Sequence, residues 1–280
     1  MPLKLMYITN SEDVAHIAEE AGVDRIFVDM EYIGKTDRQG GMDTVQSRHT
    51  ADDVRRLAQC LNKAELFVRV NPIHEKTDKY SSSKEEIDEV IEAGADLLML
   101  PYFKTAEEVQ TFVKYVNGRA KTVLLVETPE AAAIAEDLVQ IQGIDEMFIG
   151  LNDLSLGYGK NFMFELLLEG TVEELCLKFR KGGIPYGFGG IASLGKGMLP
   201  SEYVIKEHYR LGSTCAILSR SFCRTDQVTD LKEIQKIFET ELPKIRELEE
   251  ECRVHSEYFW KNRQQVETKI RQICECEDAK

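Results

Sequence analysis

The chain has 280 residues, which is long enough for one large α/β domain or two ordinary domains. Lysine and arginine total 35 against 49 aspartate and glutamate residues, so the formal net charge is −14. This acidic balance argues against nucleic acid and anionic membranes as partners. No apolar run approaches the roughly 20 residues of a membrane span and no signal-peptide pattern is present, so we expect a cytoplasmic protein. The seven scattered cysteines are expected to be reduced thiols.

Short apolar runs alternate with helical patterns along the whole chain. The expected strands cover residues 3–8, 24–30, 65–70, 96–101, 121–127, 146–150, 185–191 and 214–219. The expected helices cover residues 11–22, 50–61, 81–93, 105–118, 129–142, 165–181, 200–211 and a segment from about 230. Strict alternation predicts a parallel sheet, and eight successive units favour a closed (β/α)8 TIM barrel, an α/β fold, over an open sheet.

The composition changes near the end of the chain. We expect residues 1–228 to form the barrel, and residues 229–280 to supply its final helix and a charged helical extension. The apolar residues of this extension are too irregularly spaced for a coiled coil. Because they need burial, we expect them to pack on a neighbouring subunit, which would make the protein a homo-oligomer. A solvated, partly frayed tail is the alternative.

Two apolar strands lead to carboxylates, Glu127 after the fifth strand and Asp153 after the sixth. In a barrel, all loops that follow strands share the face where active sites lie. A small set of oxygen ligands suits Mg²⁺ or Mn²⁺. We therefore predict a metal site, in preference to a turn cap at Asp153 and a local ion pair at Glu127. Arg69 interrupts an apolar strand and suits a carboxylate or enolate oxygen at the same mouth, although a structural salt bridge to Glu127 or Glu31 is also possible.

Five segments in order resemble the HpcH/HpaI aldolase and citrate lyase family, which belongs to the phosphoenolpyruvate- and pyruvate-binding barrel enzymes. They are Asp-Met-Glu at 29–31, Val-Arg-Val-Asn at 68–71, residues 94–108, Val-Glu-Thr at 126–128 and residues 148–155. The resemblance spans about residues 1–225. It implies that Glu127 and Asp153 hold a divalent metal that chelates a pyruvate-like group, with Arg69 on the keto or enolate oxygen. Gly150, Leu151 and Asn152 are then expected to contact the substrate.

The activity implied is metal-dependent cleavage or formation of a carbon–carbon bond in an anionic 2-oxo acid. Breaking the bond β to a ketone leaves an enolate, whose charge a metal and a guanidinium would stabilise. Two alternatives stay open. The same scaffold could use phosphoenolpyruvate or an acyl thioester as partner, or the barrel could have lost catalysis and serve as a binding or scaffold protein.

The chain departs from the family pattern at Tyr32, where aldolases of this family typically have a histidine. A phenol with a pKa near 10 is a poor base at neutral pH. His49 and His74 are the nearest replacements, and we favour His74 because it closely follows Arg69. The predicted catalytic residues are therefore Arg69, His74 and Tyr32. The segment with an Arg-Gly motif that aldolases often carry between strands four and five is also missing, so the chain departs from the family pattern at a second place.

Residues 187–197 contain Gly190, four further residues, then Gly195 and Lys196, a near miss to the P-loop. Gly197 follows in place of Ser or Thr, so nucleotide hydrolysis is excluded. We expect Gly190, Ser193 and Lys196 to form an anion site, with Arg220 at the same mouth. Two loops carry cations that suggest an anionic second substrate. These cations are Lys35, Arg38, Arg48, Lys76 and Lys79.

Overall fold

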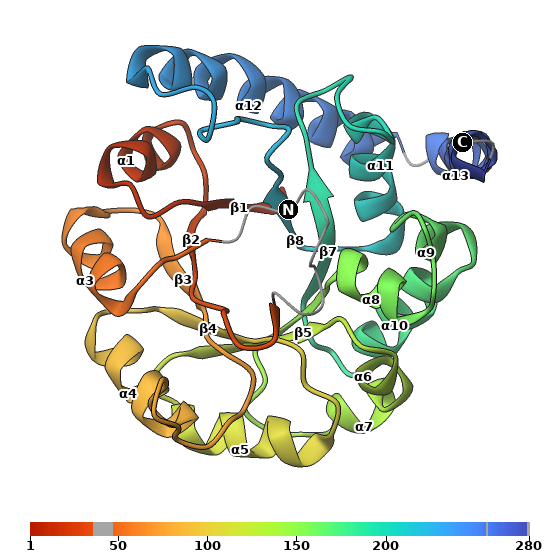
Figure 1. Cartoon of the computed structure of the whole chain (residues 1–280). Coiled ribbons are helices and arrows are strands. Elements are labelled where there is room, and N and C mark those ends of the chain that lie inside the picture. The colour runs from red at the N-terminus through yellow and green to blue at the C-terminus, as the bar shows by residue number, and fades with distance from the viewer. Residues whose placement is uncertain (36–46, 256, 279–280) are drawn as a thin grey trace.

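The computed structural model describes residues 1–35, 47–255 and 257–278. Eight parallel strands form a closed barrel in chain order, and the eighth pairs with the first (Figure 1). They are β1 Lys4–Ile8, β2 Arg25–Asp29, β3 Glu65–Arg69, β4 Leu97–Leu100, β5 Lys121–Val126, β6 Glu146–Ile149, β7 Tyr186–Ile191 and β8 Cys215–Leu218. The predicted TIM barrel is confirmed.

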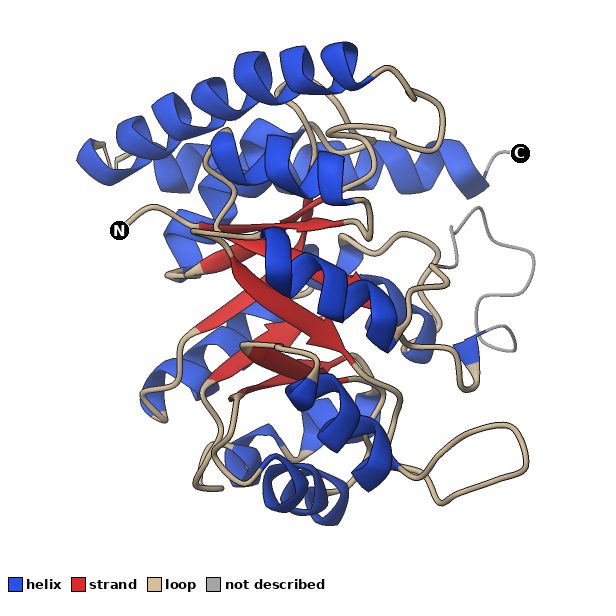
Figure 2. Cartoon of the chain, turned by 90° about the vertical axis from the view of Figure 1, so that its left-hand side faces the viewer, coloured by secondary structure: helices blue, strands red, loops and turns tan. Residues whose placement is uncertain are grey.

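Helices form an outer layer around the strands (Figure 2). They are α1 Glu12–Glu20, α3 Ala51–Cys60, α4 Ser83–Glu92, α5 Ala106–Val116, α6 Pro129–Ala133, α7 Ala135–Leu138, α8 Leu151–Gly157, α9 Glu165–Leu168, α10 Thr171–Lys181, α11 Ser201–Leu211, α12 Leu231–Val254 and α13 Tyr258–Asp278. None of the helices in the described ranges combines the length and the apolar character that crossing a bilayer requires.

Three helical segments differ from the sequence expectation. The helix expected at 129–142 is two short helices, α6 and α7, joined at Ile134. The helix expected at 165–181 divides into α9 and α10 at Gly170, whose φ of 86° lies in the left-handed region. The short helix α8 follows β6 without a separate pattern in the sequence. It matters because it carries Asp153 in its first turn.

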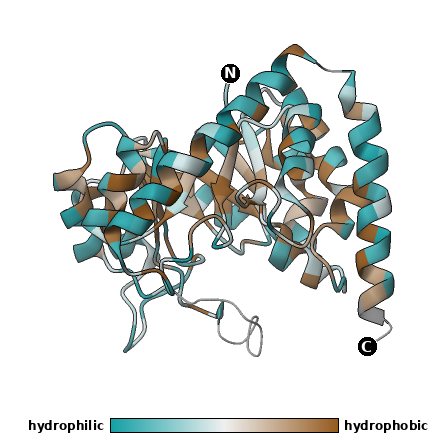
Figure 3. Ribbon diagram, turned by 90° about the horizontal axis from the view of Figure 1, so that it is seen from above, coloured by the Kyte–Doolittle hydropathy of each residue, from teal (hydrophilic) through white to brown (hydrophobic). Residues whose placement is uncertain are grey.

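Both faces of the sheet are buried, which explains the nearly continuous apolar runs in its strands. Alternate residues point into the barrel and against the helices, as Phe27 and Val28 do on β2. The inner layer consists of Met6, Phe27, Phe67, Leu97, Met99, Val123, Leu125, Phe148 and Cys215. Figure 3 shows hydrophobic residues gathered among the strands and hydrophilic residues along the outer helices. These side chains fill the barrel interior, and several of them form the base of the cavity at the carboxyl ends of the strands.

Several helices begin where a side chain caps their first turn, which sets the length of the preceding loop. Thr50, Ser82 and Thr105 each accept a hydrogen bond from the backbone three residues later, in a reciprocal capping box. These caps follow loops that leave the carboxyl ends of β2, β3 and β4. Capping therefore helps to define the loops around the barrel mouth.

The amino-terminal end of the barrel is closed by Arg25, the first residue of β2. Its guanidinium bonds both carboxylate oxygens of Glu146, at 2.7 and 2.5 Å, and its Nε lies 2.9 Å from Glu65. The side chain is fully buried and lies 5.8 Å from the centre of the Phe67 ring. Burial alone would lower the pKa of Arg25, but the two carboxylates raise it above its ordinary value.

The C-terminal helix α13 packs on α11 and α9 of its own chain. Val266 and Ile270 are 2% and 0% exposed, and the Asn262 amide donates to Glu207 at 2.9 Å. These two apolar side chains are therefore buried within their own chain and not, as expected, against a neighbouring subunit. Trp260, near the start of α13, remains 71% exposed.

Candidate active site

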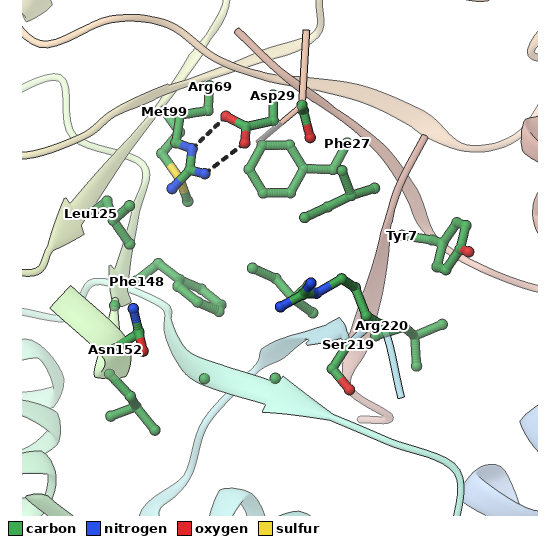
Figure 4. A pocket seen from close by; sticks show the side chains of 18 of the residues that line it. Tyr7, Phe27, Asp29, Arg69, Met99, Leu125, Phe148, Asn152, Ser219 and Arg220 are labelled. Carbon is green, nitrogen blue, oxygen red and sulfur yellow. Dashed lines mark hydrogen bonds and ion pairs between the residues drawn. The ribbon is translucent and has the colours of Figure 1, made fainter. Parts of the chain in front are cut away.

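A cavity of about 520 Å³ opens at the carboxyl ends of the strands, where a barrel places its active site. Its floor is the top of the inner layer, with Phe27, Met99, Leu125, Phe148 and Ile217. Charged and polar side chains also line the cavity, and Figure 4 shows the Arg69–Asp29 pair and Arg220 around it. An apolar base with a few convergent polar groups is typical of a small-molecule site.

Glu127 follows β5 directly and is only 3% exposed. Its Oε1 accepts a hydrogen bond of 3.0 Å from the backbone N–H of Tyr102. Tyr102 has a φ of 47°, in the left-handed region that residues with a side chain rarely adopt. Such strain commonly occurs at functional sites, and here it aims an amide at the glutamate.

Asp153 is the third residue of α8, is 9% exposed and lines the same cavity as Glu127. Between them in the chain lies Gly150, which caps α8. A Cβ on Gly150 would lie 2.7 Å from the Glu127 Cβ and 2.9 Å from its Oε2. A glycine is therefore needed here for the Glu127 carboxylate to keep its position beside the cavity.

Two buried carboxylates on one cavity suit a hard divalent cation that takes its other ligands from substrate and water. Among the described residues, a group of three close acidic, histidine or cysteine ligands occurs only at His16, Glu19 and Glu20, on α1 outside the barrel. Glu19 is already bonded to three backbone N–H groups there. At the mouth, the residues present fit Mg²⁺ or Mn²⁺.

Arg69, the last residue of β3, makes a two-pronged ion pair with Asp29, the last residue of β2. Its Nε and Nη2 each lie 2.8 Å from an Asp29 oxygen, and Nη1 lies 3.4 Å from Glu31. Burial would lower the pKa of Arg69, but Asp29 and Glu31 raise it. The expected pair with Glu31 is present, whereas Asp29 is the main partner. The guanidinium is charged, oriented and beside the cavity.

Lys35 strengthens this cluster from the loop after β2. Its Nζ lies 2.7 Å from Asp29 Oδ2 and 3.6 Å from Glu31, and the residue is buried. Burial would raise the pKa of Asp29, but Arg69 and Lys35 hold it well below its usual range. Of the other predicted loop cations, Arg38 lies outside the described residues. The remaining three are exposed and are not among the cavity residues, namely Arg48, Lys76 and Lys79.

The structure separates the two histidines that sequence reasoning weighed. The ring of His74 bonds the carbonyl oxygens of Pro72 and Ser81, at 2.7 and 2.8 Å, and is not among the cavity residues. His49 is 8% exposed and lines the cavity. Tyr32 is half-buried outside it, and burial raises its pKa to about 12. The geometry thus favours His49 over the expected His74 and Tyr32.

The first part of the glycine-rich stretch, residues 187–191, belongs to strand β7, and the remainder follows that strand. A register irregularity lies between Gly187 and Gly190. Gly189 has a φ of 54°, and a Cβ there would lie 2.8 Å from Leu151 Cδ1. The glycines therefore let α8 pack tightly against the strand. Gly189 and Gly190 line the cavity.

The rest of the expected anion site does not meet the cavity. Ser193 is buried and donates to the Phe222 carbonyl oxygen at 3.2 Å, while Lys196 is exposed. Neither is among the cavity residues, unlike Gly150, Leu151 and Asn152. Arg220 and Ser219 do line it, and Figure 4 shows Arg220 directed into the pocket from the β8 side.

The fold and mouth define a (β/α)8 barrel with a pocket that joins buried carboxylates and a fixed guanidinium above an apolar floor. The family model for HpcH/HpaI aldolase/citrate lyase matches residues 4–166, more than half of the chain. The chain belongs to the HpcH/HpaI aldolase/citrate lyase family. A comparison with curated proteins gives no match.

Solved structures of this family share the architecture. An HpcH/HpaI aldolase/citrate lyase family protein from Burkholderia cenocepacia has a TM-score of 0.61 at 17% identity, covering 84% of this chain and 95% of that one. An HpcH/HpaI aldolase from Desulfitobacterium hafniense gives 0.60 at 14% identity, with 84% and 93% covered. The citrate lyase beta subunit from M. tuberculosis, solved with oxaloacetate and magnesium, gives 0.53 at 14% identity, with 85% and 97% covered. At these identities, the likeness concerns the fold.

Proposed function

We propose that this protein is a divalent-metal-dependent carbon–carbon lyase or aldolase that acts on an anionic 2-oxo acid through a pyruvate enolate. The observation that carries this proposal is the meeting of Glu127, Asp153 and Arg69 on one cavity. Two buried acids beside a guanidinium suit a metal-bound anion and its developing charge. Membership in a family of aldolases and lyases supports the same chemistry.

Glu127 and Asp153 would hold Mg²⁺ or Mn²⁺. When bound, the ion would polarise the keto group of the substrate and offset the negative charge of its enolate form. The chain prepares this position before any ligand arrives, since the Tyr102 amide orients one Glu127 oxygen and the missing side chain of Gly150 lets the other lie close to the backbone there. Preorganised ligands lose little free energy to rearrangement on binding.

Arg69 would donate hydrogen bonds to the keto or enolate oxygen. Asp29 takes the Nε–H and one N–H of Nη2, and Glu31 lies 3.4 Å from Nη1, so we propose as donors the N–H groups that these two carboxylates do not take. Asp29 acts as a positioning residue because it fixes the guanidinium without occupying all of it, and Lys35 in turn holds the Asp29 carboxylate. A fixed donor stabilises developing charge more effectively than a mobile one.

The wall formed by the start of α8 would contact the substrate carboxylate. Gly150, Leu151 and Asn152 line the cavity, and the Gly150 N–H is bonded to Val126. We therefore assign the carboxylate contact to the backbone N–H groups of Leu151 and Asn152, which belong to the first helical turn. Gly190 faces the same cavity and remains a proposed contact. Ser193 and Lys196 have no part in this proposal.

Exchange of the pyruvate methyl hydrogens for deuterium, followed by proton NMR, tests enolisation without knowledge of the second substrate. We expect exchange that requires Mg²⁺ or Mn²⁺ and that falls by at least about 100-fold in Glu127→Gln and Asp153→Asn. Glu130→Gln is a matched control, since Glu130 is an exposed glutamate three residues away that pairs with Lys104. Metal-independent exchange, or exchange retained in Glu127→Gln, would contradict the proposal.

Two broader expectations remain part of the proposal. The exposed apolar side chains at the turn between α12 and α13 support a homo-oligomer, because Val254, Tyr258 and Trp260 are 64%, 53% and 71% exposed. The acidic composition and the scattered, odd-numbered cysteines of the sequence support the cytoplasm as location. Size-exclusion chromatography with light scattering would test the oligomeric state, and the mass of a monomer would contradict the proposed homo-oligomer.

A further inference from the structure

His49 is held in one orientation at the edge of the cavity. It precedes Thr50, the N-cap of α3, so its backbone is fixed by the start of that helix. Its ring Nδ1 accepts a hydrogen bond of 3.1 Å from the backbone N–H of Asp29. Asp29 also binds Arg69, so His49 and Arg69 are positioned by the same residue, one through its main chain and the other through its carboxylate.

This hydrogen bond determines which ring nitrogen carries the proton. A backbone N–H can only donate, so Nδ1 of His49 must be the unprotonated nitrogen. Burial lowers the pKa of His49, against the opposing effect of Asp29 and Asp53, which favours the neutral ring. In a neutral imidazole with an accepting Nδ1, the hydrogen lies on Nε2, at the other edge of the ring.

We propose that His49 is a catalytic residue that donates its Nε2–H to the carbonyl oxygen of the electrophile, and that it does not act as a base. The inference rests on the proposed function and adds the group that faces the second substrate. A base at Nε2 would need the opposite tautomer, which would set an N–H of the ring against the N–H of Asp29. Such a clash would leave a buried donor unsatisfied.

The donor serves bond formation as follows. The enolate carbon attacks the carbonyl carbon of an aldehyde, and a carbon–carbon bond forms while the carbonyl π bond breaks. The electron pair moves to the oxygen, which becomes an alkoxide hydrogen-bonded to His49 Nε2–H. The alkoxide then takes a proton from water, and the hydroxide left behind balances the proton released when pyruvate became an enolate. Cleavage is the same sequence in reverse.

Nitrogen-15 NMR of histidine-labelled protein tests the tautomer without any substrate or metal. The five histidines make the spectrum simple, and the His49→Gln variant assigns the signal. We expect the Nε2–H tautomer of a neutral ring at pH 7.5. A ring protonated on Nδ1, or a ring with both nitrogens protonated at that pH, would overturn the proposal.

A pair of variants tests the role in the reaction, with pyruvate and glycolaldehyde as probes. We expect His49→Ala to lower aldol addition by about 100-fold or more, while deuterium exchange into pyruvate stays within about threefold of the unmodified protein. His49→Gln should recover most of the loss, because its amide nitrogen reaches the place of Nε2. Equal losses in addition and exchange, or unchanged addition, would overturn the proposal.

These outcomes separate the inference from the proposed function. If the unmodified protein shows no metal-dependent exchange, the proposed enolate chemistry fails, and the tautomer measurement still decides the orientation of His49. If exchange occurs and His49→Ala abolishes it, the proposed function stands and the role of His49 is wrong. A loss confined to aldol addition supports both.

Discussion

The two ends of the barrel each hold an arginine within an ion pair, and the surroundings of these two arginines differ. Arg25 at the amino-terminal end lies between Glu146 and Glu65 with no exposed surface, whereas Arg69 at the carboxyl end is 15% exposed and lines the cavity. Each guanidinium lies 5.8 Å from the centre of a phenylalanine ring of the inner layer. The same residue type thus closes the barrel at one end and leaves donors available at the other.

The partners explain this difference. Both oxygens of Glu146 accept hydrogen bonds from the two terminal nitrogens of Arg25, and Glu65 accepts one from its Nε. Asp29 binds Nε and Nη2 of Arg69, and Glu31 lies 3.4 Å from Nη1, while the side chain still lines the cavity. We expect changes at the first arginine to alter stability, and changes at the second to alter catalysis.

The largest expected effect is on stability, in Arg25→Met. The change leaves Glu146 buried beside an apolar side chain, which should lower the free energy of unfolding by about 3–5 kcal/mol. Urea denaturation measures the loss. The double variant Arg25→Met with Glu146→Met should recover most of it, because no unpaired charge remains at that position. Equal stability of the single variant and the unmodified protein would show that the two ends do not differ as described.

Arg69→Lys should reduce pyruvate exchange by about 100- to 1,000-fold, since an ammonium cannot both hold Asp29 along one edge and donate to an enolate oxygen. The rate under saturating metal is the measurement. A matched change at the other end, Arg25→Lys, should leave the rate per folded molecule within about twofold. Comparable losses of rate in both variants would remove the distinction between the ends.

A smaller effect is expected from Gly150→Ala, which adds one methyl group at the mouth. Its Cβ would press on the Glu127 side chain, so we expect metal affinity to fall by about tenfold. Titration with Mn²⁺ followed by electron paramagnetic resonance gives the affinity. Gly190→Ala is the control, because its Cβ would meet Ser219 at 3.2 Å, away from the glutamate. Unchanged affinity in Gly150→Ala would remove Glu127 from the metal site.

The smallest effects are expected at Lys196 and His74, which the sequence predicted as an anion-binding residue and a catalytic residue. Both lie outside the cavity, so Lys196→Ala and His74→Ala should change pyruvate exchange by less than about twofold. Steady-state rates of exchange provide the comparison. A tenfold loss in either variant would mean that the mouth extends farther than the cavity residues indicate.

The fold could be predicted from the sequence because every strand has an apolar run and is followed by a helix pattern or a cap. The positions of Glu127 and Arg69 followed from the same reasoning, since each stands at the end of such a run. The position of Asp153 was harder to predict. It lies in α8, which begins two residues after the end of β6, and the sequence has no separate helical pattern there.

The choice between His49 and His74 could not be made from spacing along the chain. His74 is close to Arg69 in sequence, yet its loop turns the ring toward Ser81 and Ser83. His49 is twenty residues from Asp29 and meets it only through the fold. Likewise, the sequence could not show that the C-terminal apolar residues are buried within their own chain, because the α11 surface that covers them is distant in the chain.

The most direct test of the account is calorimetric titration of the protein with oxalate, a stable mimic of the pyruvate enolate, with and without Mg²⁺. We predict oxalate binding that requires the metal, weakens by about 100-fold in Arg69→Lys and is lost in Glu127→Gln, while Arg25→Lys binds normally. Oxalate binding that ignores the metal, or that survives in Glu127→Gln, would contradict the claim that the carboxyl end of this barrel stabilises an enolate.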